Sequence, residues 1–452
     1  MKNVLKVFCL LFLFSACGPQ YENALVLETV HVLSMEDEEI LKNQSVLIAD
    51  GKIIRIGDRG SFRFPADAEI VAGEFYIMPG LSEMHAHIPP ERMGEEWVKT
   101  VLAMYVSQGI TTIRGMLGEP SHLELREKAA NHEIVSPRIF TSGPSFNANS
   151  VSDTEQAREM VREQKETGYD LLKLHPGLTF EQFDAIADEA ALVGIEFSGH
   201  ISHAVGLVRS LDGGMTTIDH LDRYMEFLSG DPDDREDPPI IYFGYDLAFD
   251  ADEALIEEAV RLTKEAGVWN IPTNTLMENV FNPELNADKM MEWPGMDFVP
   301  ENMSERWAGF VNNMRQSDDY DAEKARRFLE LRLKLTKALH DGGAELLLGS
   351  DAPQIFNPPG FSMHRELELL TDAGLTPFEA LKTGTVNVAE YLGTQDTEGK
   401  VKAGYRADLI LLSQNPLEHF PFEDTIEGVV LHGNFMDKDS LNELLWGLQA
   451  DE

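Results

Sequence analysis

Short apolar runs alternate with amphipathic stretches across the centre of the chain, between residues 77 and 393. The apolar runs are bounded by turn-forming residues, as buried strands are, and the stretches between them show the apolar period of a helix. Eight strands are predicted in this way, at residues 81–85, 110–115, 138–142, 171–175, 196–200, 216–220, 268–273 and 345–350. Strands that alternate with crossover helices predict an α/β fold, a (β/α)8 barrel of the TIM type.

Both ends of the chain have a different, β-rich pattern. Near the N-terminus, strands are predicted at residues 24–33, 45–48 and 52–56, and Asp50-Gly51 is typical of the turn of a hairpin. Similar apolar runs follow the predicted barrel, and they lie at residues 408–412 and 428–432. The predicted division is therefore a β-rich segment 21–78, a barrel 79–395, a second β-rich segment 396–440 and a C-terminal tail 441–452.

The first residues have the form of a signal peptide. An apolar run at residues 7–14 follows two lysines, is too short to span a bilayer, and leads into Ser-Ala-Cys17. This ending resembles a bacterial lipobox, so we expect residues 1–17 to be a lipoprotein signal peptide with lipidation at Cys17. An ordinary secretory leader is the alternative. The lipoprotein interpretation implies export to the bacterial cell envelope and membrane contact through this anchor only, and Gly18 favours the outer membrane.

Composition narrows the range of partners. The chain has 78 acidic and 37 basic residues, a net charge of −41 at pH 7. Such a charge repels nucleic-acid phosphates, so nucleic acid is not an expected partner. The only cysteines are Cys9 and Cys17, one inside the predicted leader and one at its end. Neither a disulfide nor a cysteine nucleophile is therefore expected in the mature chain.

Side chains that bind metals lie at the ends of the predicted strands. His85 and His87, in the motif PGLSEMHAH, are two positions apart on a strand, so both imidazoles can point to the same side. Four more candidate ligands lie at or near the ends of other strands: Lys173, His200, His220 and Asp351. A barrel gathers its strand ends at one face, so these six residues predict a site for zinc, manganese or a similar divalent ion.

The order of these residues resembles the amidohydrolase superfamily, in particular the members with two metal ions bridged by a carboxylated lysine. The motifs that carry the resemblance are PGLSEMHAH, GITTIRGM, the block from GHISHAVG to IDH, LGSDAP and AGYRADLILL. Within the superfamily the chain is most similar to the imidazolonepropionase-related and Xaa-Pro dipeptidase-like branch. The resemblance implies that segments 21–78 and 396–440 form a small β-sandwich beside the barrel.

The resemblance also implies the cofactors and their roles. Two divalent ions are expected, zinc first with manganese or cobalt as alternatives, together with carbon dioxide as a carbamate on Lys173. A hydroxide bridging the ions would attack the substrate, and Asp351 would move its proton to the leaving nitrogen. Lys173 and Asp351 are thus the expected catalytic residues. The expected ligands are His85, His87 and Asp351 at the more buried ion, His200 and His220 at the second, and Lys173 at both.

Further candidates concern the substrate. Side chains near strand ends that could bind a carboxylate or carbonyl group are Arg114, His175, His203, Arg223, Tyr224 and His364. Two segments, 229–252 and 279–341, exceed a minimal barrel and begin at the same rim. They are expected to form either a lid or simple decoration.

Together these features predict a metal-dependent hydrolase that cleaves amide C–N bonds in small molecules, for example a dipeptidase of prolidase type. One alternative keeps the fold but changes the substrates to cyclic amides, lactones, carbamates or organophosphate esters. Another is a non-catalytic surface lipoprotein that binds a ligand, which would have no physical need for the complete ligand set. The sequence leaves open whether the chain forms a homo-oligomer.

Overall fold

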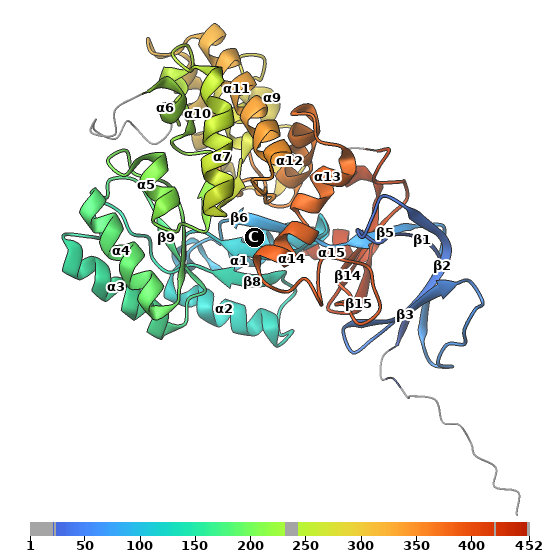
Figure 1. Cartoon of the computed structure of the whole chain (residues 1–452). Helices are drawn as coiled ribbons and strands as arrows, with labels where there is room; N and C mark the ends of the chain where they lie inside the picture. Colours follow the sequence, from blue (N-terminus) through green and yellow to red (C-terminus); the bar gives the residue numbers. More distant parts are fainter. Residues whose placement is uncertain (1–20, 22–23, 231–242, 420–421, 450–452) are drawn as a thin grey trace, which may run out of the picture.

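The computed structural model describes residues 21, 24–230, 243–419 and 422–449. The predicted leader with Cys17 lies outside the described residues, and so does part of the predicted segment 229–252. Within the described ranges, no helix combines the length and the apolar character needed to cross a bilayer. Strands from both chain ends lie together on one side of an α/β region (Figure 1).

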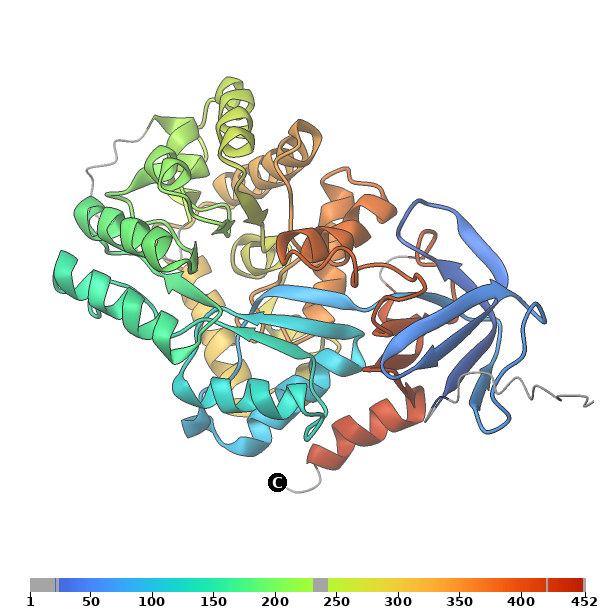
Figure 2. The same cartoon turned by 60° about the horizontal axis from the view of Figure 1, so that its bottom comes forward.

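The two chain ends share one mixed sheet of eight strands, in the order β15-β14-β13-β5-β1-β2-β3 with β4 paired to β1. The strands are β1 (Leu25–Leu33), β2 (Ile40–Ala49), β3 (Lys52–Asp58), β4 (Glu69–Ala72), β5 (Tyr76–Pro79), β13 (Leu409–Leu412), β14 (Ile426–Leu431) and β15 (Asn434–Asp437). The C-terminal β13 pairs with the N-terminal β5, and this joins the ends of the chain (Figure 2). The two packed sheets of a β-sandwich stay a prediction.

Local sequence explains much of this sheet. Ala49 pairs with Lys52 across Asp50 and Gly51, whose φ angles of 50° and 69° suit a two-residue hairpin turn. The predicted hairpin is therefore confirmed. Alternate apolar side chains along β1 and β2 are buried in a core cluster that also includes Leu409 and Leu411 of β13.

The α/β region contains parallel strands close to the predicted positions. They are β6 (Leu81–Ala86), β7 (Ile110–Gly115), β8 (Arg138–Thr141), β9 (Leu171–Leu174), β10 (Glu196–Gly199), β11 (Thr217–Asp219) and β12 (Trp269–Ile271). They form a sheet β6-β7-β8 and a sheet β12-β11-β10-β9. Single parallel bridges link these sheets, one of them between Ser142 and Leu171.

The prediction of a regular eighth strand at residues 345–350 was wrong. Within it, only Leu346 forms a bridge, with Asn270 next to β12 in the ladder. The neighbouring backbone groups have other partners, because Leu348 N donates to Thr383 O while Leu348 O accepts from Met84 N of β6. The segment thus lies between β12 and β6, but it forms no continuous ladder with either strand.

Helices connect the strands and cover the α/β region. Those between β6 and β12 are α1 (Glu95–Ser107), α2 (Pro120–Ala130), α3 (Thr154–Thr167), α4 (Phe180–Val193), α5 (Gly206–Asp212), α6 (Tyr224–Ser229) and α7 (Ile256–Ala266). Side-chain caps start two of them, since Asp153 accepts from the first-turn amides of α3 and Thr179 forms a capping box with Gln182 in α4.

More helices follow β12: α8 (Asn274–Phe281), α9 (Ala287–Met290), α10 (Glu301–Arg315), α11 (Ala322–Gly342), α12 (Phe361–Asp372), α13 (Pro377–Thr383), α14 (Val386–Tyr391) and α15 (Lys438–Gln449). The predicted segment 279–341 thus includes α9, α10 and most of α11, and α11 contacts α7 (Figure 1). Residues 441–449 of the predicted tail belong to α15, which contacts α1 and has Leu441 and Leu445 buried in the core.

Candidate metal centre

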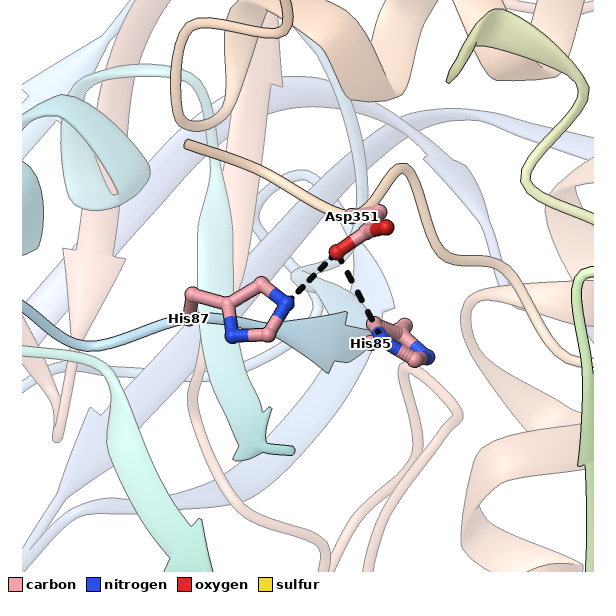
Figure 3. Close-up of side chains that lie close together, drawn as sticks. All are labelled: His85, His87 and Asp351. Carbon is pink, nitrogen blue, oxygen red and sulfur yellow. Dashed lines mark hydrogen bonds and ion pairs between the residues drawn. The ribbon is translucent and has the colours of Figure 1, made fainter. Parts of the chain in front are cut away.

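Two histidines and one aspartate meet where β6 ends. Asp351 follows segment 345–350, and the backbone joins it to the strand, because Asp351 N donates to His85 O at 3.1 Å and His87 N donates to Ala352 O at 2.7 Å. One ligand atom of each side chain lies within 4.8 Å of those of the other two. Asp351 Oδ1 lies 2.6 Å from His87 Nε2 and 3.5 Å from His85 Nε2 (Figure 3). The two histidines therefore share one side, as the strand period predicts.

Two further predicted ligands extend this cluster. His200 follows β10 and His220 follows β11, and their ring centroids are 4.6 Å apart. The ring of His220 lies 4.5 Å from that of His85, and its Nε2 lies 3.9 Å from Asp351 Oδ2. The Asp351 carboxylate thus has one oxygen towards His85 and His87 and the other towards His220.

The backbone at two of these positions is unusual. His220 and Asp351 have φ angles of 62° and 66°, in the left-handed region that non-glycine residues seldom adopt. Such conformations cost on the order of 1–3 kcal/mol each and persist where surrounding contacts hold them. At His220, the backbone O accepts a hydrogen bond of 2.7 Å from buried Arg332, and the backbone N donates to Ile271 O at 2.8 Å. These contacts fix the direction of the imidazole.

Each of the three buried histidines has an oxygen next to its Nδ1 atom. The partners are Asp219 Oδ2 for His85 at 3.0 Å, Asp222 Oδ2 for His200 at 2.9 Å and Thr273 Oγ1 for His220 at 2.7 Å. The contacts of His200 and His220 are hydrogen bonds, and an Nδ1 atom that donates in this way leaves Nε2 free to bind a metal. The contact of His85 is similarly short but lacks hydrogen-bond geometry. His220 Nε2 is buried and has no hydrogen-bond partner among the described residues, as a ligand atom that awaits a cation would be.

Lys173, in β9, is completely buried, and its Nζ atom lies 3.5 Å from Asp219 Oδ2. Burial lowers the pKa of the Lys173 amine, because the charged form loses its hydration. Burial would raise the pKa of Asp219, but the neighbouring Lys173 and Arg114 outweigh it and hold that pKa below its ordinary value. Asp219 therefore places a negative charge between the predicted bridging lysine and the ligand His85.

Burial also acts on the histidines. It lowers the pKa of His85 and of His220 well below the ordinary value, and nearby Lys173 lowers both further. The imidazoles are therefore neutral at physiological pH, which is the form that binds a metal ion. The donor set of imidazoles and a carboxylate consequently fits divalent ions of the zinc type.

Buried Glu83 links the two segments that carry His85 and Asp351. It accepts hydrogen bonds from His85 N at 3.0 Å and from Ser350 Oγ at 2.6 Å. Burial raises the pKa of Glu83 to about 8. The Glu83 side chain thus holds the backbone at His85 next to Ser350, the residue before Asp351.

A cavity of about 310 Å³ opens over these ligands. We name it the α8 cavity, because four residues of α8 form one of its walls. Its lining residues are His85, His87, Leu117, His175, His200, Phe243, Leu276, Met277, Val280, Phe281, Asp351, Gln354 and Ile355. His175 is the predicted substrate-binding residue that lines it, and its ring lies 5.0 Å from that of His200.

The other predicted substrate residues do not line this cavity. Arg114 is buried, and its guanidinium donates to Met84 O and to Tyr391 Oη, each at 2.8 Å. Arg114 therefore supports the strands instead of facing the cavity. His364 is buried edge-on against Phe422, away from the ligand cluster.

The remaining three candidates are also engaged within the protein. Arg223 donates to Ile201 O at 2.8 Å and to Glu226 Oε1 at 2.6 Å, and it lies 3.0 Å from His203 Nδ1. Tyr224 is buried, with its hydroxyl bonded to Thr263 and Asn270. A position close to a strand end does not by itself direct a side chain into the cavity.

The comparisons with known proteins identify the family of the chain. The chain matches the Amidohydrolase family over residues 76–436, a range that includes every predicted metal ligand. The chain belongs to the amidohydrolase family. Ochratoxinase from Aspergillus niger is 24% identical over 319 residues, 67% of this chain and 52% of that protein. The match thus spans about half the length of that curated relative.

Two other amidohydrolase relatives are matched over more of their length. Imidazolonepropionase from Kosmotoga olearia is 22% identical over 437 residues, 90% of this chain and 94% of that protein. A solved Xaa-Pro dipeptidase with bound methionine has a TM-score of 0.67 and 17% identity, covering 92% of this chain and 100% of that chain. The structural likeness shows an α/β fold of the TIM-barrel type.

Several functional residues of this amidohydrolase were missed from the sequence. Asp219 and Asp222 contact the predicted ligands, and both flank His220 in the segment IDHLD, so adjacency to a ligand was a usable signal. Glu83 stands inside the HxH motif region and could have been noticed in the same way. Thr273 and Arg332 had no such signal, because their contacts with His220 form only in the folded chain.

Proposed function

We propose that the chain is a metal-dependent hydrolase that cleaves amide C–N bonds in small molecules and uses two divalent metal ions. One observation carries the proposal. The Asp351 carboxylate lies between two groups of imidazoles, with Oδ1 2.6 Å from His87 Nε2 and Oδ2 3.9 Å from His220 Nε2. A carboxylate in this position can serve as a ligand and can also exchange a proton with a substrate held above it.

The chain offers ligands for two ions, of which zinc is the first candidate, with manganese or cobalt as alternatives. When bound, such ions lower the pKa of water and polarise a carbonyl group. Lys173, as a carbamate formed with carbon dioxide, is proposed to contact both. We assign His85, His87 and Asp351 to one ion and His200 and His220 to the other.

The protein's own groups then have defined tasks. Asp351 takes the proton of the attacking water and passes it to the leaving nitrogen, while the new C–O bond forms and the C–N bond breaks. Gln354 Nε2 donates to Asp351 Oδ2 at 3.1 Å and so helps to orient the carboxylate. The products are a carboxylic acid and an amine.

The finer features of the sequence analysis are part of this proposal. Closure of the strands into a (β/α)8 barrel is supported by segment 345–350, which hydrogen-bonds to both β12 and β6. A β-sandwich, lipidation at Cys17, envelope localisation and a dipeptidase activity of prolidase type rest on the sequence resemblance. The Xaa-Pro dipeptidase likeness makes peptides the first substrates to test.

The test is hydrolysis of a panel of small peptide amides by protein loaded with zinc or manganese in the presence of bicarbonate. Asp351→Asn keeps the size of the side chain but removes its basicity, and we expect it to abolish turnover. Asp184→Asn, on the surface, is the matched control and should keep full activity. Equal turnover by the two variants would contradict the assigned role of Asp351.

A further inference from the structure

A second cavity adjoins the α8 cavity at the metal ligands. It measures about 370 Å³, and we name it the Trp97 cavity. Both cavities are lined by His87 and Leu117, so they meet at these two residues.

The wall of the α8 cavity opposite the ligands is apolar. Leu276, Met277, Val280 and Phe281 recur along α8 at the spacing of one helix face, and all are at most 3% exposed. Phe243 continues this wall towards the histidines, because its ring lies 5.3 Å from that of His220. A group that contacts this wall therefore leaves water for a hydrocarbon surface.

The Trp97 cavity has a similar apolar floor. Ile88, Trp97 and Met303 are 3–8% exposed, and they come from three separate segments: the chain after β6, α1 and α10. Its charged members, Arg92 and Glu119, are more exposed than this floor. A group that reaches the floor next to His87 consequently meets apolar side chains first.

We propose that the site accepts amides whose groups on both sides of the scissile bond are apolar and uncharged. This inference rests on the proposed amide hydrolysis, and it replaces free dipeptides by peptides with blocked ends as the expected substrates. With the carbonyl at His87, one flanking group lies in the α8 cavity and the other in the Trp97 cavity. Among peptides, those with blocked ends are preferred to free dipeptides.

The physical reason is the cost of burying charge. A free dipeptide carries an ammonium group and a carboxylate on the carbons that directly adjoin its amide, and burying either beside α8 forfeits its hydration. Apolar flanking groups instead gain free energy when they leave water. The net charge of −41 adds a general repulsion of anionic substrates.

The experiment compares two probes with the same side chains, N-acetyl-Phe-Leu-amide and free Phe-Leu. Calorimetric titration of the metal-stripped full chain measures binding without turnover, and the loaded enzyme is assayed separately for hydrolysis. We expect the blocked probe to bind about tenfold more tightly than the free one. Equal or tighter binding of Phe-Leu, or no binding of either probe, would overturn the inference.

Two variants locate the binding. Val280→Phe fills the α8 cavity and should weaken binding of the blocked probe about tenfold, whereas Val208→Phe, on the exposed side of α5 at 43% exposure, should leave it unchanged. Ile355→Lys, at a half-buried position that tolerates a long polar chain, should narrow the preference by favouring the carboxylate of Phe-Leu. If Val280→Phe and Ile355→Lys both prefer the blocked probe over Phe-Leu as strongly as the wild type does, the probe does not bind in the α8 cavity and the inference is wrong.

The two readouts separate the inference from the proposed function. Tighter binding of the blocked probe supports the substrate class, whether or not it is cleaved. If the loaded enzyme cleaves neither probe while the binding preference holds, the hydrolase proposal fails and the binding inference stands.

Discussion

His85 Nδ1 lies 3.0 Å from Asp219 Oδ2 in the interior of the protein. The same oxygen lies 3.5 Å from Lys173 Nζ, and the other carboxylate oxygen lies 3.6 Å from Arg114 Nη2. One buried carboxylate thus contacts the predicted ligand His85 together with Lys173 and Arg114. Arg114 is thus held by Asp219, Met84 and Tyr391 beneath the candidate metal centre.

Asp219→Asn should weaken metal binding about tenfold to a hundredfold, because it keeps the size of the side chain but removes the charge that orients His85. Competition with a chelator, read by metal release, measures the effect. Asp184→Asn, on the surface of α4, is the control. Unaltered metal affinity in Asp219→Asn would mean that His85 is oriented by other contacts.

Arg332→Met tests the support of His220. The guanidinium donates to His220 O at 2.7 Å and to Pro272 O at 2.6 Å and is completely buried. Loss of these charge-assisted hydrogen bonds should lower the free energy of unfolding by about 2–4 kcal/mol. Urea denaturation checks this value against Arg326→Met, an exposed arginine that pairs with Glu284, for which a change below about 1 kcal/mol is expected.

Glu366 should make stability depend on pH. Burial raises its pKa to about 7, so the folded protein holds this proton more tightly than the unfolded chain does. Its contribution to stability is therefore fully present below the unfolded value of 4.5 and is lost as pH rises through about 7. Relative to Glu366→Gln, the wild type should lose up to about 3 kcal/mol of unfolding free energy over this window. Denaturation at pH 4.5 and 8 measures it, and parallel profiles would contradict the assignment.

Lys173→Ala should lower kcat/KM on the order of a hundredfold, because it removes the group that is proposed to contact both ions. Short carboxylic acids such as acetate should restore part of the activity by taking the place of the carbamate. Lys165→Ala, which replaces an exposed lysine of α3, should keep the kcat/KM of the wild type, and acetate should not alter it. Full activity in Lys173→Ala would contradict the proposed carbamate on this lysine.

The sequence predicted those features that depend on local pattern. Residues 81–85 and 171–175 are short runs rich in apolar side chains, so the positions of β6 and β9 follow from the sequence alone. The assignment of His85 and Lys173 as metal ligands stays a prediction. His85 and His87 share a side for the same reason, since the strand period alone decides it.

Features set by distant contacts could not be predicted. Arg114 ends a strand, as a substrate residue would, yet its partner Tyr391 lies 277 positions away. Segment 345–350 has the composition of a strand, but its hydrogen bonds go to several elements. The amphipathic pattern of α15 predicts that one face is buried, but it does not predict that this helix packs against α1.

The most direct test of the account is the metal content of the purified, reconstituted protein, measured by mass spectrometry together with protein concentration. We predict about two divalent ions per chain in the wild type, and about one in a His200→Asn, His220→Asn double variant that retains its fold by circular dichroism. One ion or fewer in the reconstituted wild type, or the same content in the double variant, would contradict the two-metal centre.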